Sequence, residues 1–266
     1  AFAVTSVLVL VLIAIAFAAP VLAPYDPTHA TMQDAFMAPG GSHLFGTDKL
    51  GRDNLSRVLY GARASLSGVL FLVASVFIVG TSMGVISGYF GGKVDMVIMR
   101  ISDMMISFPG MILAIAVAGI MGGSLVNAVI ALTIVSWTKY ARLSRSLVLQ
   151  IKRRDYVEAA IVNGGTSPHI LWVHILPNIL PMMVITAAAD IGALMMELAG
   201  LSFLGFGSQP PAPEWGLMLN EGRQQLQTAP WLMVFPGLAI FVTVMIFNLW
   251  GDNLRDVLDP RNDVQD

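Results

Sequence analysis

Long apolar runs without any charge dominate this sequence. Residues 65–92 contain no charged side chain, and neither do residues 104–138. A helix needs about 20 apolar residues to cross the hydrocarbon core of a bilayer, so the first run is long enough for one crossing. At about 1.5 Å per residue the second run is too long for one crossing, and residues 122–124 (Gly-Gly-Ser) are its natural break. The pattern therefore predicts an all-α polytopic membrane protein.

The composition agrees with a lipid environment. Hydrophobic residues make up 56% of the chain and charged residues 12%, whereas soluble domains carry about 25% charged residues. The absence of cysteine excludes disulfides and thiolate metal sites. No metal-ligand cluster and no nucleophile-base pair stands out, so we expect no catalytic residue, metal or cofactor in this chain.

Six crossings fit the pattern, near 5–23, 65–92, 100–121, 125–147, 175–206 and 232–249. Residues 1–23 form the first helix, and residues 65–266 form a five-helix core. A cleaved signal peptide is the alternative for the first helix, but its apolar run exceeds the roughly 7–15 residues of a signal sequence. Because the chain begins at Ala1 rather than Met, we expect a short N-terminal piece to be missing.

Basic residues set the expected orientation. They cluster between the fourth and fifth spans, at Lys139, Arg142, Arg145, Lys152, Arg153 and Arg154. By the positive-inside rule, the polar loop 148–174 faces the cytoplasm. Loops 24–64 and 207–230 then lie outside, and both termini are cytoplasmic. The four basic residues of loop 24–64 run against the rule, but they are less densely clustered.

The polar loop 148–174 predicts two short helices with a break. Asp155 with Glu158 three residues later can form a capping box. Asn163-Gly164-Gly165 can end that helix, and Ser167 suits the start of the next. Read by itself, the segment is compatible with an ordinary helix-turn-helix linker between two spans.

Gly80, Gly84 and Gly88 recur at four-residue spacing in the second span. Small residues on one face of a membrane helix let a neighbouring helix approach closely. We therefore expect this face to pack against another span.

The polar loop also resembles a known element, the EAA loop of ABC importer permeases. The matching residues, in order and spacing, are Glu158, Ala159, Ala160, Gly164, Leu176 and Pro177. His174 replaces the usual Ile, and this form is common in the peptide/nickel branch. Residues 44–53, 200–205, 213–216 and 251–260 resemble the same branch, in the subunit usually called C. The resemblance spans about residues 44 to 260.

This resemblance implies a permease subunit in the inner membrane of a bacterial cell. It implies a heterodimer with a homologous permease, two ATP-binding subunits that bind ATP and magnesium, and an extracytoplasmic solute-binding protein. The EAA loop would couple ATP hydrolysis to transport. The candidate residues for docking the binding protein are Asp48, Arg52, Asp53, Glu214 and Trp215. The alternative for residues 44–53 is a turn-rich loop whose Asp and Arg side chains pair locally.

Two carboxylates lie inside the fifth span. Asp190 and Glu197 are seven residues apart and share a helix face. Ionisable residues inside a span usually face a pathway or a cavity, so we expect these two to line the translocation path. Leu194 on the same face is apolar, and hydrogen bonding to a neighbouring helix is the alternative.

The substrate is open at this stage. Residues 190–192, 195–196 and 247–249 look slightly more like nickel permeases, which favours nickel or a metal chelate. A dipeptide or oligopeptide is the alternative. A second alternative is a self-sufficient secondary transporter or channel, which would use Asp190 and Glu197 as cation sites and need no ATPase.

Overall fold

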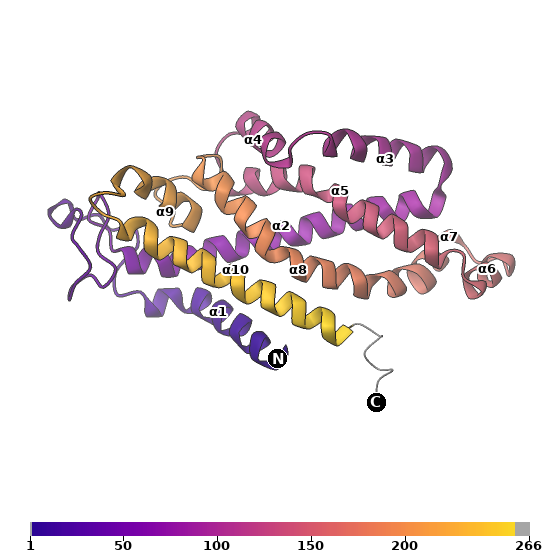
Figure 1. Ribbon diagram of the computed structural model, residues 1–266, viewed down its shortest axis with the longest axis horizontal. Coiled ribbons are helices and arrows are strands. Elements are labelled where there is room, and N and C mark those ends of the chain that lie inside the picture. Colours follow the sequence, from indigo (N-terminus) through magenta and orange to yellow (C-terminus); the bar gives the residue numbers. More distant parts are fainter. Residues whose placement is uncertain (1, 259–266) are drawn as a thin grey trace.

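The computed structural model describes residues 2–258, and its regular structure in this range is helical. Figure 1 shows the long helices running side by side along the longest axis. The helices are α1 Phe2–Leu22, α2 Asn54–Phe90, α3 Gly92–Ile106, α4 Gly110–Met121, α5 Leu125–Ile151, α6 Asp155–Val162, α7 Ser167–His169, α8 Leu176–Phe203, α9 Trp215–Gly222 and α10 Trp231–Leu258. A π-helical turn, Ile170–Ile175, joins α7 to α8. The all-α fold class is therefore confirmed.

Helix α2 begins earlier than the sequence suggested. The Asp53 side chain caps it by accepting a hydrogen bond from the backbone N–H of Ser56 at 2.8 Å. The helix then continues from Asn54 to Gly91, whose φ of 64° ends it. Residues 54–64 of the expected external loop 24–64 are thus helical, and the first turns of α2 project into the polar end of the molecule.

Four helical stretches are long and apolar enough to cross a membrane singly: α1, α2, Ser167–Phe203 and α10. Helices α3 and α4 qualify only as a pair, and they are bent by 95° at the break between them. Pro109 lies in that break, at the N-cap of α4, and its fixed ring cannot continue a helix. The expected span over 100–121 is therefore not one continuous helix, and a single broken span across this bend stays a prediction.

The expected fourth span, α5, is not among these four. Its second half carries Lys139, Arg142 and Arg145, which lower its hydropathy. The structure thus contains four apolar crossings, or five if the α3–α4 pair is one broken span, in residues 2–258. Six crossings stay a prediction.

The glycine face of α2 packs against α5. A side chain at Gly80 would bring its Cβ to 2.5 Å from the Trp137 carbonyl oxygen, and one at Gly88 would lie 2.9 Å from Val148 Cβ. Between them, Gly84 lies directly against Ala141 and Ser144. The close helix approach expected from the glycine spacing is confirmed.

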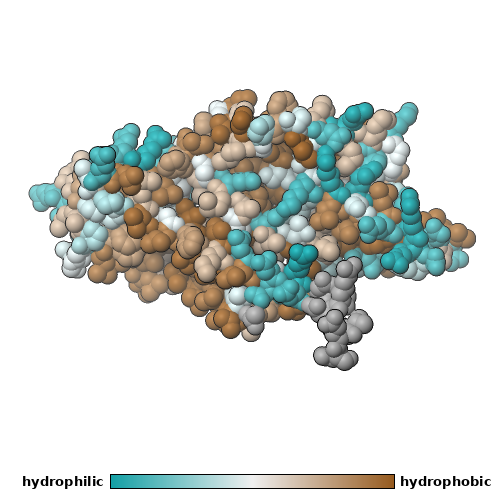
Figure 2. Space-filling model, in the orientation of Figure 1, coloured by the Kyte–Doolittle hydropathy of each residue, from teal (hydrophilic) through white to brown (hydrophobic). Residues whose placement is uncertain are grey.

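Polar segments gather at the two ends of the molecule. The loop between α1 and α2 lies with α9 at one end, and α6 and α7 lie at the opposite end (Figure 1). Figure 2 shows hydrophobic side chains over much of the middle of this face and hydrophilic ones towards both ends. The start of α1 contacts the last part of α10, where Trp250 Nε1 donates to Ser6 Oγ at 3.1 Å. The first and last helices are thus antiparallel neighbours.

Candidate functional site

The coupling-loop candidate begins with α6. The N-cap is Arg154, and no side chain caps the helix, so the expected Asp155–Glu158 capping box does not form. Both carboxylates lie in the first turn, where they meet the positive end of the helix dipole. Glu158 and Ala159 are exposed, and Ala160 is half-buried.

Gly164 closes α6 in a left-handed conformation with φ 81°. The N–H of Gly165 donates to the Ala160 carbonyl, and the N–H of Asn163 donates to the Ala159 carbonyl, both at 3.0 Å. Residues with a Cβ are strained at such a φ, so glycine is favoured at position 164. This part of the expected break is confirmed.

The chain then runs without a gap into the long helix α8. Thr166 rather than Ser167 is the N-cap of α7, and the helical backbone continues from Ser167 to Phe203. Leu176 and Pro177 lie in the first turn of α8. Ile170 and Ile175 are buried and anchor the π-helical turn to the core. A displacement of α6 and α7 would therefore be carried into α8.

Large apolar side chains are exposed around this loop. Val162 is 86% exposed and Trp172 is 72% exposed, and the others are Tyr156, Ile161 and Val173. Exposed apolar side chains gathered at a polar end mark an interaction site. The EAA-loop motif does not include Val162 or Trp172. The sequence feature that could have identified them is a large apolar side chain within a polar loop.

In the middle of the long helices, Asp190 forms an ion pair with a lysine side chain. Lys139 Nζ on α5 lies 2.7 Å from both carboxylate oxygens of Asp190 on α8, and Tyr140 Oη donates to Asp190 at 3.1 Å. Glu197 is exposed and lies beside Ser136 of α5. Leu194 between the two carboxylates is buried in the core. The sequence analysis had used Lys139 only for orientation.

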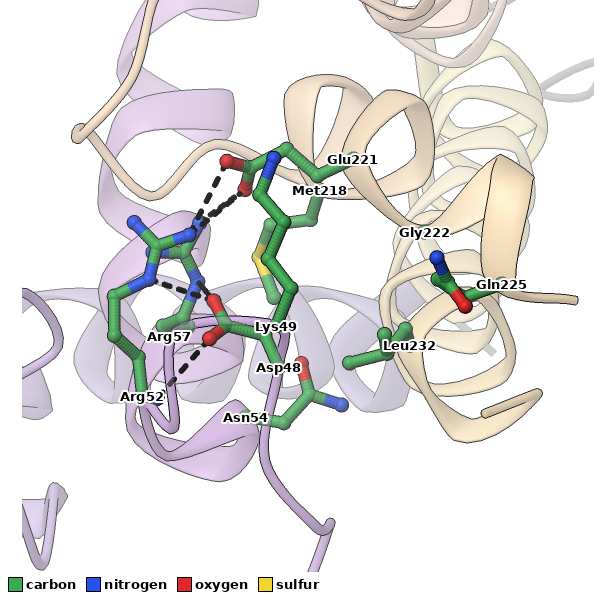
Figure 3. A pocket seen from close by; sticks show the side chains of 10 residues that line it. All are labelled: Asp48, Lys49, Arg52, Asn54, Arg57, Met218, Glu221, Gly222, Gln225 and Leu232. Carbon is green, nitrogen blue, oxygen red and sulfur yellow. Dashed lines mark hydrogen bonds and ion pairs between the residues drawn. The ribbon is translucent and has the colours of Figure 1, made fainter. Parts of the chain in front are cut away.

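At the opposite end, a buried charge cluster joins the first loop to α9 (Figure 3). Glu221 accepts hydrogen bonds from Arg57 Nη2 at 2.6 Å and from Arg52 Nη2 at 3.2 Å. Arg52 Nε also donates to Asp48 at 2.6 Å. The two arginine residues are 2% and 1% exposed. Sequence reasoning missed Glu221, because nothing in the sequence pattern links it to arginines 164 and 169 residues away.

The other candidate residues for docking, Asp53, Glu214 and Trp215, also stabilise the local structure. Asp53 caps α2, and Glu214 caps α9 by accepting from the N–H groups of Gly216 and Leu217 at 2.9 Å. Trp215 Nε1 donates to the carbonyl of Val58 at 2.9 Å.

The five candidate residues Asp48, Arg52, Asp53, Glu214 and Trp215 are all buried in the isolated chain. They cannot be presented to a docking protein without rearrangement. Their burial and hydrogen bonds favour the alternative of local pairing, and direct docking by these side chains stays a prediction.

Comparison with known proteins agrees with this architecture. Residues 80–264 match the family described as binding-protein-dependent transport system inner membrane component, and the chain belongs to this family. It is 46% identical over 254 residues to the glutathione transport system permease protein GsiD of Pectobacterium atrosepticum, covering 95% of this chain and 84% of the relative. Multi-pass membrane insertion follows from the family and from the apolar helices.

Two further relatives indicate which type of permease this chain resembles. The chain is 43% identical to the dipeptide transport system permease protein DppC of Alkalihalophilus pseudofirmus, covering 94% of this chain and 82% of the relative. It is 40% identical to the nickel transport system permease protein NikC of Escherichia coli, covering 90% and 86%. The resemblance to peptide/nickel permeases is confirmed.

The fold resembles a solved structure, titled inward-facing conformations of the MetNI methionine ABC transporter. The match has a TM-score of 0.62 at 19% identity, and it covers 77% of this chain and 97% of the other.

Proposed function

We propose that this chain is the membrane-spanning permease subunit of an ATP-driven importer and forms half of its translocation pathway. The coupling loop carries the proposal, because the exposed Trp172 stands on a helical backbone that runs from Ser167 to Phe203, and α6 with the exposed Val162 directly precedes it. A force applied at this loop would move a spanning helix. The family membership supports the same function.

The proposed partners follow from this function. They are a homologous permease, two ATP-binding subunits that hold ATP and magnesium, and an extracytoplasmic solute-binding protein. The coupling loop would receive an ATP-binding subunit, which puts this end in the cytoplasm of a bacterial cell. The loop between α1 and α2 and α9 would then face the binding protein.

We propose a small peptide as the transported solute. Relatives with glutathione and dipeptide in their names are 46% and 43% identical to this chain. Nickel or a nickel chelate, favoured by the sequence pattern, is the second candidate, because a relative with nickel in its name matches 90% of the chain. Uptake of a labelled dipeptide and of ⁶³Ni²⁺ by the reconstituted complex separates the two.

The test of coupling uses Glu158→Arg and Gly164→Asp in the assembled complex. Glu158→Arg reverses an exposed charge on α6, and Gly164→Asp adds a charge just past its exposed end. We expect the permease pair to assemble and the bound subunits to hydrolyse ATP while solute uptake falls at least about tenfold, as expected when about 1.4 kcal/mol of coupling is lost.

Gly164→Asn is the matched control, because Asn tolerates the left-handed conformation and adds no charge. It should retain more uptake than Gly164→Asp. Full uptake in both test variants would contradict the coupling assignment. A secondary transporter, in contrast, would transport in liposomes without any ATP-binding subunit.

A further inference from the structure

Two side-chain contacts link α5 and α8 in the membrane region. Lys139 lies near the midpoint of α5, and Asp190 near the midpoint of α8, where they form the ion pair at 2.7 Å. Further towards the outer end of the two antiparallel helices, Glu197 of α8 lies beside Ser136 of α5. At about 1.5 Å per residue, Glu197 stands roughly 10 Å along the helix from Asp190.

The two carboxylates differ in their partners. Asp190 accepts from Lys139 and from Tyr140, and its charge is balanced. Glu197 forms no ion pair with any residue in the described range 2–258. We call the contact between α5 and α8 that contains Lys139, Asp190 and Glu197 the α5–α8 seam. With these three side chains ionised, the seam carries one excess negative charge, which is that of Glu197.

A carboxylate without an ion-pair partner near the middle of two long helices can face only certain environments. Facing lipid is costly for an ionised side chain, and burial in a dry protein interface without a cation is also costly. A water-filled pathway avoids both penalties. Glu197 is exposed in the single chain, and so is Lys139, at 61% of its side chain. This exposed edge of α5 and α8 therefore fits the pathway side of the subunit.

The same two helices flank the coupling loop. Helix α5 ends at Ile151, and α8 begins at Leu176, with α6 and α7 between them. A displacement of that loop acts on both helices, and the Lys139–Asp190 pair is a side-chain link between them. The pair is suited to keep the two helices together while they move.

We propose that Glu197 contacts the positively charged group of the solute in the pathway, whereas Lys139 and Asp190 are positioning residues that hold α5 against α8. The proposal rests on the proposed transport function. The shared ligand chemistry is a cationic group, either the side-chain ammonium of a peptide or a metal cation. Asp190, although it lies on the same helix face, does not contact the solute.

The test compares Glu197→Gln with Glu197→Asp in the reconstituted complex. The probes are the dipeptides Lys-Ala and Glu-Ala, and ⁶³Ni²⁺. Losing a hydrogen bond to a charged group costs about 1.5–3 kcal/mol, so we expect Glu197→Gln to lower uptake of the cationic substrate at least about tenfold. The ratio of Lys-Ala to Glu-Ala uptake should fall, and Glu197→Asp should restore it in part.

Variants of Lys139 and Asp190 test the positioning role. Asp190→Asn leaves Lys139 unpaired and removes the excess negative charge, so we expect it to lower uptake of cationic substrates. Lys139→Gln combined with Asp190→Asn returns the excess charge to that of the wild type, so the Lys-Ala to Glu-Ala ratio should return. Total uptake of both dipeptides should stay below wild type, because the ion pair between α5 and α8 is lost. Asp103→Asn also neutralises a carboxylate, but one that lies on α3 and pairs with Arg142 instead of Lys139, so it is the control and should leave the ratio unchanged.

The outcomes distinguish the proposed solute contact of Glu197 from the proposed ATP-driven import. An unchanged substrate ratio and unchanged ⁶³Ni²⁺ uptake in Glu197→Gln would overturn the role of Glu197 while the complex still transports. If wild-type complex takes up ⁶³Ni²⁺ but no dipeptide, the peptide assignment fails, and a loss of ⁶³Ni²⁺ uptake in Glu197→Gln still supports the contact. Transport by this chain alone would overturn the ATP-driven function instead.

Discussion

Single residues at the end formed by the first loop and α9 show how a membrane protein can bury charge. Arg52 and Arg57 are almost completely buried, and both reach the carboxylate of Glu221, which is 14% exposed. Burial of a charge is tolerated only when it is paired and hydrogen-bonded. Glu221 thus fixes the loop before α2 to α9, although 164 to 169 residues separate the partners in sequence.

Glu221→Gln should destabilise the protein strongly. The substitution leaves two buried guanidinium groups with Asp48 as their remaining carboxylate, and breaking a buried pair costs roughly 3–5 kcal/mol. We expect a clearly lower midpoint of thermal unfolding in detergent, followed by tryptophan fluorescence.

Asp103→Asn is the control for this experiment. It removes an ion pair with Arg142 whose side chains are 45% and 55% exposed, and such pairs are worth about 0–1 kcal/mol. Equal midpoints for the two variants would contradict a stabilising role of the Glu221 cluster.

At the scale of elements, the packing of α2 on α5 organises the bundle. Three glycines in successive turns of α2 let the α5 backbone approach, and Arg145 of α5 pairs with Asp95 of α3 at 2.5 Å. Lys152, just past the end of α5, donates to the carbonyl of Tyr89 near the end of α2 at 2.6 Å. These contacts hold the α2–α3 hairpin against the helix that leads into the coupling loop.

Gly84→Ala should loosen this packing. The added Cβ would overlap the Ala141 carbonyl and the Ser144 hydroxyl, and overpacking costs typically about 1–3 kcal/mol. We expect a lower unfolding midpoint and less monodisperse protein in size-exclusion chromatography. Gly237→Ala in α10 is the matched control, because its Cβ would meet Leu219 at 3.9 Å. A larger loss in the control would contradict this account.

At the scale of the whole molecule, the two polar ends differ. The end formed by the first loop and α9 contains buried ion pairs, whereas the opposite end exposes apolar side chains on α6 and the π-helical turn. This contrast fits a solute entry that keeps its shape and a coupling loop that is completed by another subunit.

Cysteine labelling tests the orientation, since the chain has no cysteine of its own. Ser42→Cys in the first loop and Val162→Cys on α6 are both exposed. We expect a membrane-impermeant maleimide to label Ser42→Cys in spheroplasts and Val162→Cys only in inverted vesicles. Added ATP-binding subunits should slow labelling of Val162→Cys and leave Ser42→Cys unaffected. The reverse pattern of access would contradict the orientation.

Much of the architecture was predictable because it depends on local sequence. Long apolar runs require helices in lipid, where each backbone N–H and C=O must be paired internally. The glycine spacing at 80, 84 and 88 predicted a close helix contact, and Gly164 predicted the helix break, since both depend on short-range geometry.

Only the tertiary structure decided which distant side chains meet. It turned the chain by 95° near Pro109, buried the motif residues Arg52 and Glu214, and joined Lys139 to Asp190. A sequence pattern gives residue types along one element, but ion pairs and burial depend on how elements pack in space. The sequence by itself thus determined a helical membrane protein with a polar loop between two apolar segments, and the packing of α5 on α8 decided that Asp190 has an ion-pair partner there and Glu197 has none within residues 2–258.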